Sequence, residues 1–233
     1  MNTVGIDISL TSTGLYIIKD NQEYYFNYYK SDKLSKLHNK LDFITYRLYD
    51  YKINEDFSNN EILKMLQYND VTNKIIEDIL TVIGDSIEDT IVTIESYNYN
   101  ATRNNNSNTL IDTVAISTLL RIKILKEKFK IVSFIKPTSL KKYVCESVYG
   151  LGELTKKGKP KKPSANKLGI PGGKFTKSEM FLAMMESKYE TKLKSYLTED
   201  VKYLYSLKNI PKPLDDIIDA MWLAYIGLEQ YNI

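Results

Sequence analysis

Residues 3–29 read TVGIDISLTSTGLYIIKDNQEYYFNYY, and this stretch decides the fold class. In residues 3–9, apolar side chains alternate with small or polar ones, which is the period of two expected for a β-strand. Two β-rich runs follow at residues 14–19 and 23–29, and the Asp20-Asn21 pair between them is typical of a hairpin turn. The N-terminus is therefore predicted to form three consecutive antiparallel strands.

The rest of the chain alternates between helical and strand patterns. Short apolar runs predict strands at residues 90–95 and 131–135. Helical spacing predicts helices over residues 34–51, 60–83 (with a break near Asn69-Asp70), 109–129, 139–148, 178–188 and 214–230. Together these elements indicate an α/β fold with one mixed five-stranded sheet flanked by helices. The 233 residues, 43% of them apolar, are enough for a single domain of this kind.

Composition excludes several classes of site. Cys145 is the only cysteine, so the chain has neither an internal disulfide nor a thiolate metal cluster. His38 is the only histidine, which excludes catalytic histidine pairs and imidazole-rich zinc sites. A hydrolase with this composition must rely on carboxylates. The sequence shows neither a signal peptide nor an apolar run long enough to span a membrane, so we expect a cytoplasmic protein.

Positive charge is concentrated in residues 136–177. This segment has eleven lysines and two glutamates, a net charge of +9, so the rest of the chain carries −6. Such a segment favours a polyanionic partner, nucleic acid first, although a solvated loop is the alternative. Interleaved prolines and glycines indicate an arm or long hairpin rather than a helix.

Two acids lie in or beside predicted strands. Asp7 is flanked by Ile6 and Ile8 in the most strand-like run, where an ionised side chain needs a partner unless the strand is an exposed edge. Glu95 closes the predicted strand 90–95, and ligands bind at the carboxyl ends of strands in open α/β sheets. A strand end that simply emerges into solvent explains Glu95 equally well.

The predicted C-terminal helix carries two more acids in an apolar setting. Because this helix is apolar on nearly all sides, we expect it to be buried. Asp216 and Asp219 share one face, where like charges repel and burial adds a desolvation cost. Asp216 also suits the first turn of a helix, but Asp219 lies further in. We expect neither Lys208 nor Lys212 to reach Asp219, so the pattern favours a divalent cation over an ion pair.

The order of these acids resembles that of the RuvC-type Holliday junction resolvases, which have the ribonuclease H-like fold. The matching residues are Gly5-Ile6-Asp7 with Thr13-Gly14, Ile94-Glu95, Asp216-x-x-Asp219-Ala220, Lys136-Pro137 with Lys141, and Gly150 with Gly152. The similarity covers residues 3–18, 91–128, 131–152 and 214–228, about half the chain. The chain departs from the family pattern by insertions at about residues 51–84 and 153–174 within one nuclease domain, residues 1–233.

The resemblance implies a function and its residues. It implies a structure-specific endonuclease that cuts branched DNA, with Asp7, Glu95, Asp216 and Asp219 holding two Mg²⁺ ions (Mn²⁺ being possible) astride one phosphodiester. It also implies phosphate contacts from Lys141 and Lys177 and base stacking by Tyr97 or Tyr99. The full set of expected DNA-binding lysines is Lys141, Lys142, Lys156, Lys157, Lys159, Lys161, Lys162, Lys174 and Lys177.

Family members act as symmetric homodimers, and the predicted helix 109–129 offers an apolar stripe for such an interface. The stripe consists of Ile111, Val114, Ala115, Thr118, Leu119 and Ile122, and its alternative role is to face the core. The abundance of Lys, Asn, Ile and Tyr suits an AT-rich genome such as that of a phage or other virus.

Three other functions fit parts of the sequence. An actin/Hsp70-like nucleotide-binding module opens with a similar strand, Asp and Thr-Gly hairpin, but does not require two carboxylates on the last buried helix. A catalytically inactive nuclease fold would bind nucleic acid through the lysine-rich segment alone. A ribonuclease H-like enzyme acting on RNA or on an RNA–DNA hybrid would need the same acids.

Overall fold

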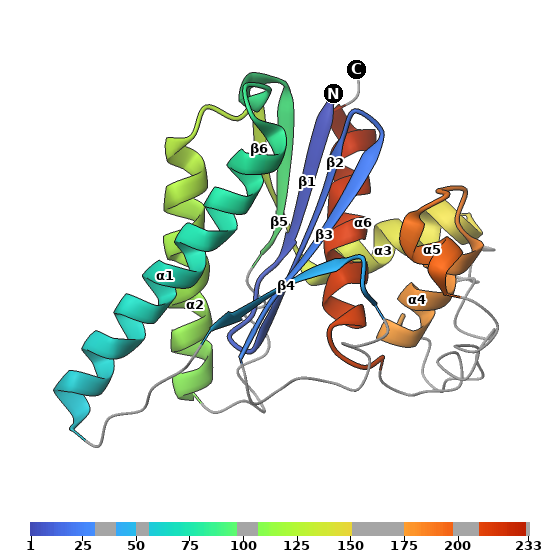
Figure 1. The fold of residues 1–233 in the computed structure, drawn as a ribbon. Coiled ribbons are helices and arrows are strands. Elements are labelled where there is room, and N and C mark those ends of the chain that lie inside the picture. The colour runs from blue at the N-terminus through green and yellow to red at the C-terminus, as the bar shows by residue number, and fades with distance from the viewer. Residues whose placement is uncertain (31–40, 50–55, 97–106, 151–174, 198–209, 232–233) are drawn as a thin grey trace, which may run out of the picture.

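The computed structural model describes residues 1–30, 41–49, 56–96, 107–150, 175–197 and 210–231. Helices cover both faces of one twisted sheet, with α1 and α2 on one face and α6 on the other (Figure 1). The sheet has six strands in the order β4-β3-β2-β1-β5-β6. The expected α/β architecture, a mixed sheet flanked by helices, is confirmed.

The first three strands form the predicted antiparallel meander. They are β1 (Asn2–Asp7), β2 (Ser12–Lys19) and β3 (Gln22–Lys30). The turn between β2 and β3 is at Asp20 and Asn21, as predicted, and both have positive φ values of 51° and 62°. Asp and Asn tolerate this conformation better than other residues with side chains, and it matches the twist of a tight hairpin.

Two parallel strands complete the predicted part of the sheet. β5 (Thr90–Glu95) pairs with β1, and β6 (Ile131–Ile135) pairs with β5. Both strands match the predicted bounds. Their carboxyl ends lie at the same edge of the sheet as the end of β1, because all three run in the same direction.

The sixth strand, β4 (Ile44–Tyr49), corrects the prediction of a helix over residues 34–51 and of five strands. β4 pairs in parallel with β3 at the sheet edge. Its sequence, ITYRLY, is rich in β-branched and aromatic residues, which favour strands. Arg47 donates two hydrogen bonds to Asp78 of α1, at 3.0 and 2.6 Å, and so fastens the edge strand.

The helices agree with the predicted positions to within a few residues. They are α1 (Phe57–Ile83), α2 (Ser107–Lys126), α3 (Pro137–Tyr149), α4 (Lys177–Glu186), α5 (Lys192–Tyr196) and α6 (Leu214–Tyr231), with a short 3₁₀ turn at Ile87–Asp89. The short α5 was not predicted. α1 continues through Asn69-Asp70, where we predicted a break, since Tyr68 and Val71 keep its apolar face buried.

Two hydrophobic clusters fill the spaces on either side of the sheet. One joins the sheet to α1 and α2, and the other joins it to α3, α4 and α6. As predicted, α6 is buried along most of its length. No helix in the described part of the chain is both long enough and apolar enough to cross a membrane. The predicted insertion at about residues 153–174 lies outside the described residues.

Candidate active site

The end of β1 places Asp7 beside Glu95. β1 and β5 are parallel neighbours, and the paired residues Ile6 and Ile94 immediately precede the two acids. Asp7 is the last residue of its strand rather than a mid-strand residue, and it is 6% exposed. The hydrogen-bonding register of the sheet therefore brings together two acids that are 88 residues apart in sequence.

Close contact between α6 and the sheet brings the other two acids to the same place. A Cβ atom on Gly5 would lie 1.9 Å from the carbonyl oxygen of Ala220, and one on Gly14 would lie 2.3 Å from that of Asp216. The helix backbone therefore rests directly on β1 and β2, which only glycine permits at these points. Thr3 adds a hydrogen bond of 2.9 Å from Oγ1 to the carbonyl oxygen of Ala224.

Three of the four predicted acids form one cluster. Carboxylate oxygens of Asp7, Glu95 and Asp219 all lie within 4.8 Å of one another. Asp219 is 3% exposed and Glu95 is half-buried. Asp7 and Glu95 end β1 and β5, and Asp219 lies in the second turn of α6.

The fourth acid, Asp216, lies on the same helix but is not part of this cluster. Its Oδ2 accepts a hydrogen bond of 2.5 Å from Ser12, and its Oδ1 pairs with Lys212. Asp216 is 1% exposed, so its carboxylate depends on these two partners for compensation.

Lysines reach the acids, contrary to our expectation for Asp219. Lys177, the first residue of α4, forms an ion pair with Asp219. Lys212 pairs with Asp216 and lies 3.4 Å from Asp215. The distance between Lys177 and Asp219 in the sequence hid the first pair, whereas the i,i+4 spacing of Lys212 and Asp216 was a usable signal.

Burial and mutual repulsion perturb the protonation of the site. Burial raises the pKa of the Glu95 carboxyl, and the neighbouring Asp7 raises it further, while Lys177 and Lys141 act in the opposite direction. Burial raises the pKa of Asp216 to about 8, although the Lys212 ammonium opposes this shift. Both carboxyls therefore hold a proton more strongly than a carboxyl in water does, and a further positive charge would favour their ionised forms.

The donor set fits a divalent cation. Asp7, Glu95 and Asp219 offer hard oxygen ligands from three elements, and a divalent cation would relieve the repulsion between carboxylates this close together. The Oδ1 atom of Asp219 is buried and has no hydrogen-bond partner in the described part of the chain. That oxygen is available as a ligand even while Lys177 contacts Oδ2.

Sequence reasoning missed two residues that contact the site. Ser12 and Asn27 were absent from the predicted set, yet Ser12 bonds Asp216 directly and Asn27 bonds Ser12. The only sequence signal for Ser12 was its position: it is a small polar residue at the start of a strand, two residues before Gly14.

The predicted DNA-binding residues are only partly described. Lys141 and Lys177 both act on the protonation of Glu95, which places them near the cluster. Lys142 is exposed and lies 3.8 Å from Glu146 on its own helix. The remaining predicted contacts, Tyr97, Tyr99, Lys156, Lys157, Lys159, Lys161, Lys162 and Lys174, lie outside the described residues.

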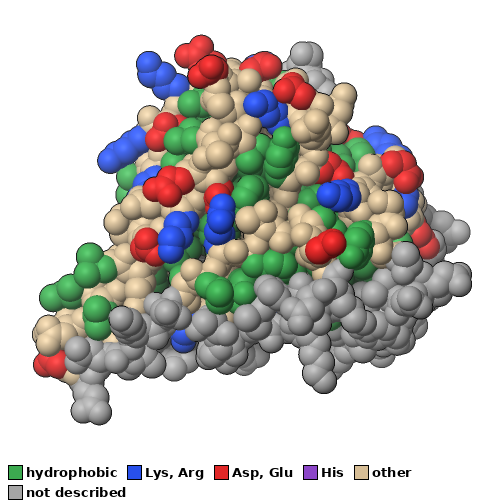
Figure 2. All heavy atoms as spheres, in the orientation of Figure 1, with side chains coloured by type: hydrophobic (Ala, Val, Ile, Leu, Met, Phe, Trp, Pro, Cys, Tyr) green, Lys and Arg blue, Asp and Glu red, His purple; other side chains and the backbone are tan. Residues whose placement is uncertain are grey.

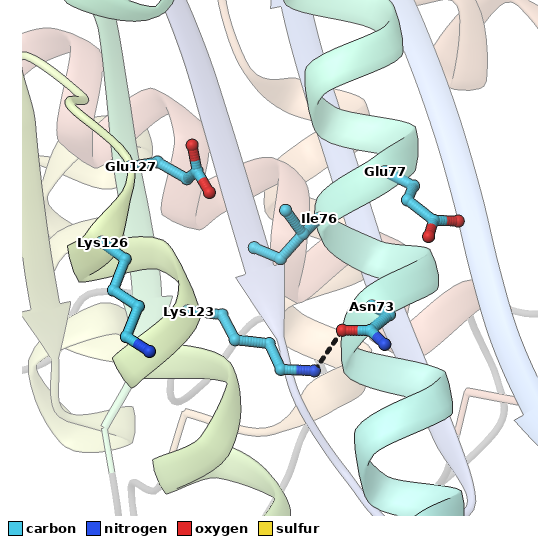
Figure 3. Close-up of a pocket in the computed structure, with 6 residues that line it drawn as sticks. All are labelled: Asn73, Ile76, Glu77, Lys123, Lys126 and Glu127. Carbon is cyan, nitrogen blue, oxygen red and sulfur yellow. Dashed lines mark hydrogen bonds between the residues drawn. The ribbon is translucent and has the colours of Figure 1, made fainter.

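A separate surface hollow lies on the opposite face of the sheet. Figure 3 shows it between α1 and α2, lined by Asn73, Ile76, Glu77, Lys123, Lys126 and Glu127. Lys123 is held there by neutral oxygen acceptors of α1, among them Thr72 Oγ1 at 2.8 Å. In the view of Figure 2, positive and negative side chains are interspersed over the coloured surface rather than segregated. The hollow thus has a different chemical character from the acid cluster.

No protein-family model matches the chain, and no curated protein matches it in sequence. Among solved structures, RuvC of T. thermophilus in complex with a Holliday junction substrate is similar, with a TM-score of 0.42 and 9% identity over 99% of this chain and 95% of that one. A second Thermus thermophilus RuvC structure has a TM-score of 0.41 and 12% sequence identity, over 100% of this chain and 97% of that one. The yeast mitochondrial Holliday junction resolvase Ydc2 has a TM-score of 0.44 and 13% sequence identity, over 98% of this chain and 80% of that one.

Proposed function

We propose that this protein is a crossover junction endonuclease, which hydrolyses phosphodiesters in branched DNA with the help of divalent cations. The observation that carries the proposal is the convergence of Asp7, Glu95 and Asp219, from β1, β5 and α6, with carboxylate oxygens within 4.8 Å. Burying three acids together is costly unless a cation compensates them. A structural role alone would be served better by apolar side chains.

Mg²⁺ is the cation that we propose, with Mn²⁺ as a substitute and two ions as the full complement. Asp7, Glu95 and Asp219 would hold the first, and Asp216 would join them for the second. Bound there, the metal would lower the pKa of a water for attack on phosphorus and neutralise charge on the leaving oxygen. The chain itself fixes the carboxylates, because β1, β5 and α6 hold them through backbone contacts.

Lys177 and Lys141 would serve the substrate. Lys177 contacts Asp219 through a half-buried side chain that begins α4. When a divalent cation neutralises Asp219, the ammonium of Lys177 is free to bind a DNA phosphate, which attracts the ammonium electrostatically. The lysine-rich segment and Tyr97 or Tyr99 would add further phosphate and stacking contacts.

A symmetric homodimer would present two such sites to the two strands of a junction. The predicted stripe on α2 is divided in the structure: Ile111 is 65% exposed and Ile122 is 47% exposed, whereas Ala115 and Leu119 are partly buried and pack against the core. Exposed aliphatic side chains along one helix suit contact with a second copy. Sedimentation of the protein and of Ile122→Glu would test this, and a wild-type monomer would refute it.

The test of function is a substrate comparison. The protein is incubated with a synthetic four-way junction, a linear duplex and an RNA–DNA hybrid, each with and without Mg²⁺. We expect Mg²⁺-dependent cleavage of the junction, with little cutting of the duplex. Preferential cutting of the hybrid would select a ribonuclease H-like activity. Stabilisation by a nucleotide with no cleavage would select the actin/Hsp70-like alternative, and binding without cleavage an inactive nuclease.

A further inference from the structure

Ser12, Asn27 and Asp216 form a buried chain of hydrogen bonds that joins β2, β3 and α6. Asn27 Nδ2 donates to Ser12 Oγ at 3.1 Å, and Ser12 Oγ donates to Asp216 Oδ2 at 2.5 Å. Ser12 is 3% exposed, and Asn27 and Asp216 are each 1% exposed. Because these groups are shielded from water, their hydrogen bonds are stronger than equivalent bonds at the surface.

The chemistry of the donors sets the direction of this chain. An amide nitrogen can only donate, so Ser12 Oγ accepts from Asn27 and its single hydroxyl hydrogen is directed at Asp216. Asn27 Nδ2 also donates to the Thr13 carbonyl oxygen at 3.1 Å, which fixes the plane of the amide. Ser12 is therefore a fixed donor to one oxygen of the carboxylate.

The connection between β1 and β2 holds Ser12 in place relative to Asp7. Ser9 Oγ donates to the Ser12 carbonyl oxygen at 2.7 Å and accepts from the Ser12 amide at 3.2 Å. Thr13 Oγ1 donates to the Ser9 carbonyl oxygen at 3.0 Å. These bonds make the path from the end of β1 to the start of β2 a rigid link.

The two oxygens of Asp216 are thus in different situations. Oδ2 faces the fixed hydroxyl of Ser12, whereas Oδ1 faces the ammonium of Lys212, whose side chain is 42% exposed. The ammonium at Oδ1 can be exchanged for another cation, whereas the buried hydroxyl of Ser12 is fixed on its strand and cannot leave Oδ2. Oδ1 is therefore the oxygen that a divalent cation can take over from Lys212.

We propose that Ser12, oriented by Asn27, is a positioning residue for Asp216, which holds the carboxylate so that Oδ1 is presented to the cation. This inference rests on the proposed function and names a residue that the resemblance did not supply. Hydrogen-bonding partners of metal-binding carboxylates orient them, and their loss costs about 10–100-fold in metal affinity or activity.

The experiment compares Ser12→Ala with a matched control, Ser133→Ala. Ser133 is also a buried strand serine, and its Oγ donates to Thr93 Oγ1 at 3.1 Å rather than to a carboxylate. Titration calorimetry measures the binding of Mn²⁺ to the protein alone, and thermal unfolding in EDTA checks the fold. Cleavage of a four-way junction is followed as a function of Mg²⁺ concentration.

We expect Ser12→Ala to weaken Mn²⁺ binding about tenfold and to raise the Mg²⁺ concentration for half-maximal cleavage to a similar extent. Cleavage at saturating Mg²⁺ should recover most of its rate, and Ser12→Thr should restore the affinity. Ser133→Ala should leave both quantities unchanged. If Ser12 acts through Asp216, Ser12→Ala should cause no further loss in an Asp216→Asn background.

Equal Mn²⁺ affinities in Ser12→Ala and Ser133→Ala would overturn the inference. So would an additional loss in the Asp216→Asn background, because Ser12 would then act by another route. A wild-type protein that binds Mn²⁺ but cuts no junction would refute the proposed nuclease function, and the calorimetric comparison would still decide the role of Ser12. A wild-type protein that binds no Mn²⁺ would overturn the inference, since Asp216 would have no cation to hold.

Discussion

The two faces of the sheet hold their helices in different ways. α6 lies on its face through backbone contacts, since side chains on Gly5 or Gly14 would collide with the helix. α1 and α2 lie on the opposite face through interlocking aliphatic side chains, among them the fully buried Ile75, Ile79 and Leu120. The distance from α6 to the sheet is therefore set by hard backbone atoms, whereas that of α1 and α2 depends on side-chain packing.

This difference matches the positions of the acids. A carboxylate cluster needs its oxygens placed to within a fraction of an ångström, and backbone contact provides that precision. An aliphatic layer tolerates small volume changes by repacking. Changes on the α6 face should therefore affect chemistry first, while comparable changes on the α1–α2 face should affect only stability.

The largest effect is expected from removing one charge of the cluster. Asp7→Asn should lower junction cleavage by on the order of a thousandfold, because the ligand acts mainly in the transition state. Binding of the uncut junction, measured in Ca²⁺ by gel shift, should change little. The matching change on the opposite face, Glu77→Gln beside the hollow of Figure 3, should leave the cleavage rate unchanged. Equal losses of binding and cutting in Asp7→Asn would contradict a metal-ligand role.

The next effect comes from one added methyl group. A Cβ atom in Gly14→Ala would lie 2.3 Å from the Asp216 carbonyl oxygen, so α6 must shift, at a cost of about 1–3 kcal/mol. Ile75→Val, which removes one methyl group from the opposite layer, should cost about 0.5–1.5 kcal/mol. Urea unfolding measures both.

The informative quantity is the activity that remains under conditions where each variant is fully folded. We expect Gly14→Ala to lose Mn²⁺ affinity and Ile75→Val to keep it. If the two variants show the same affinity, backbone contact on the α6 face has no special role in placing the acids.

How much of this arrangement could be predicted depends on the range of the interactions. β5, β6 and α6 have strong local periodicity, and their predicted bounds were nearly correct. β4 was predicted as a helix because its apolar spacing fits both periods, and only its pairing with β3 decides between them. The four acids of the site could be predicted because they are charged residues within apolar runs, and the structure brings three of them together.

The partners of the acids were not predictable in the same way. Lys177 reaches Asp219 only because α4 packs beside α6, a tertiary contact without a local pattern. Ser12 and Asn27 are ordinary strand residues until β2, β3 and α6 are placed together. The contacts that give Lys177, Ser12 and Asn27 their roles come from distant parts of the chain, so the local sequence around each residue indicates its role only weakly.

The α6 face should also respond to pH in a way that the other face does not. Burial raises the pKa of Asp216 from 3.8 to about 8, and burial and Asp7 raise that of Glu95. Between pH 4 and 8 the folded, metal-free protein therefore retains protons that the unfolded chain has released, so its stability falls as pH rises. Mg²⁺ binds the ionised carboxylates, so its stabilising effect should grow over the same range.

Thermal unfolding in EDTA and in Mg²⁺ at several pH values measures both trends. Asp216→Asn should flatten the pH dependence of the metal-free protein, because it removes one of the groups whose pKa differs between the two states. A Mg²⁺ stabilisation that is the same at pH 5 and pH 8 would contradict the assignment of these carboxyls as its ligands.

The smallest effects should come from two lysines that share a chemical type but not an environment. Lys212 pairs with the buried Asp216, whereas Lys123 bonds neutral acceptors of α1, Asn69 Oδ1 at 2.9 Å and Thr72 Oγ1 at 2.8 Å. Replacing either lysine by Met should destabilise the metal-free protein. We expect a loss of about 1–2 kcal/mol for Lys212→Met, a range that allows for solvent screening of its partly exposed side chain, and of at most about 1 kcal/mol for Lys123→Met. The response to Mg²⁺ distinguishes the two variants. A divalent cation can replace the lost ammonium beside Asp216, so Mg²⁺ should restore the melting temperature of Lys212→Met to that of the wild type. The melting temperature of Lys123→Met should stay below that of the wild type in Mg²⁺. A Lys212→Met deficit that persists in saturating Mg²⁺ would mean that the ammonium and the metal do not compete for Asp216, and that the two faces differ in packing but not in electrostatics.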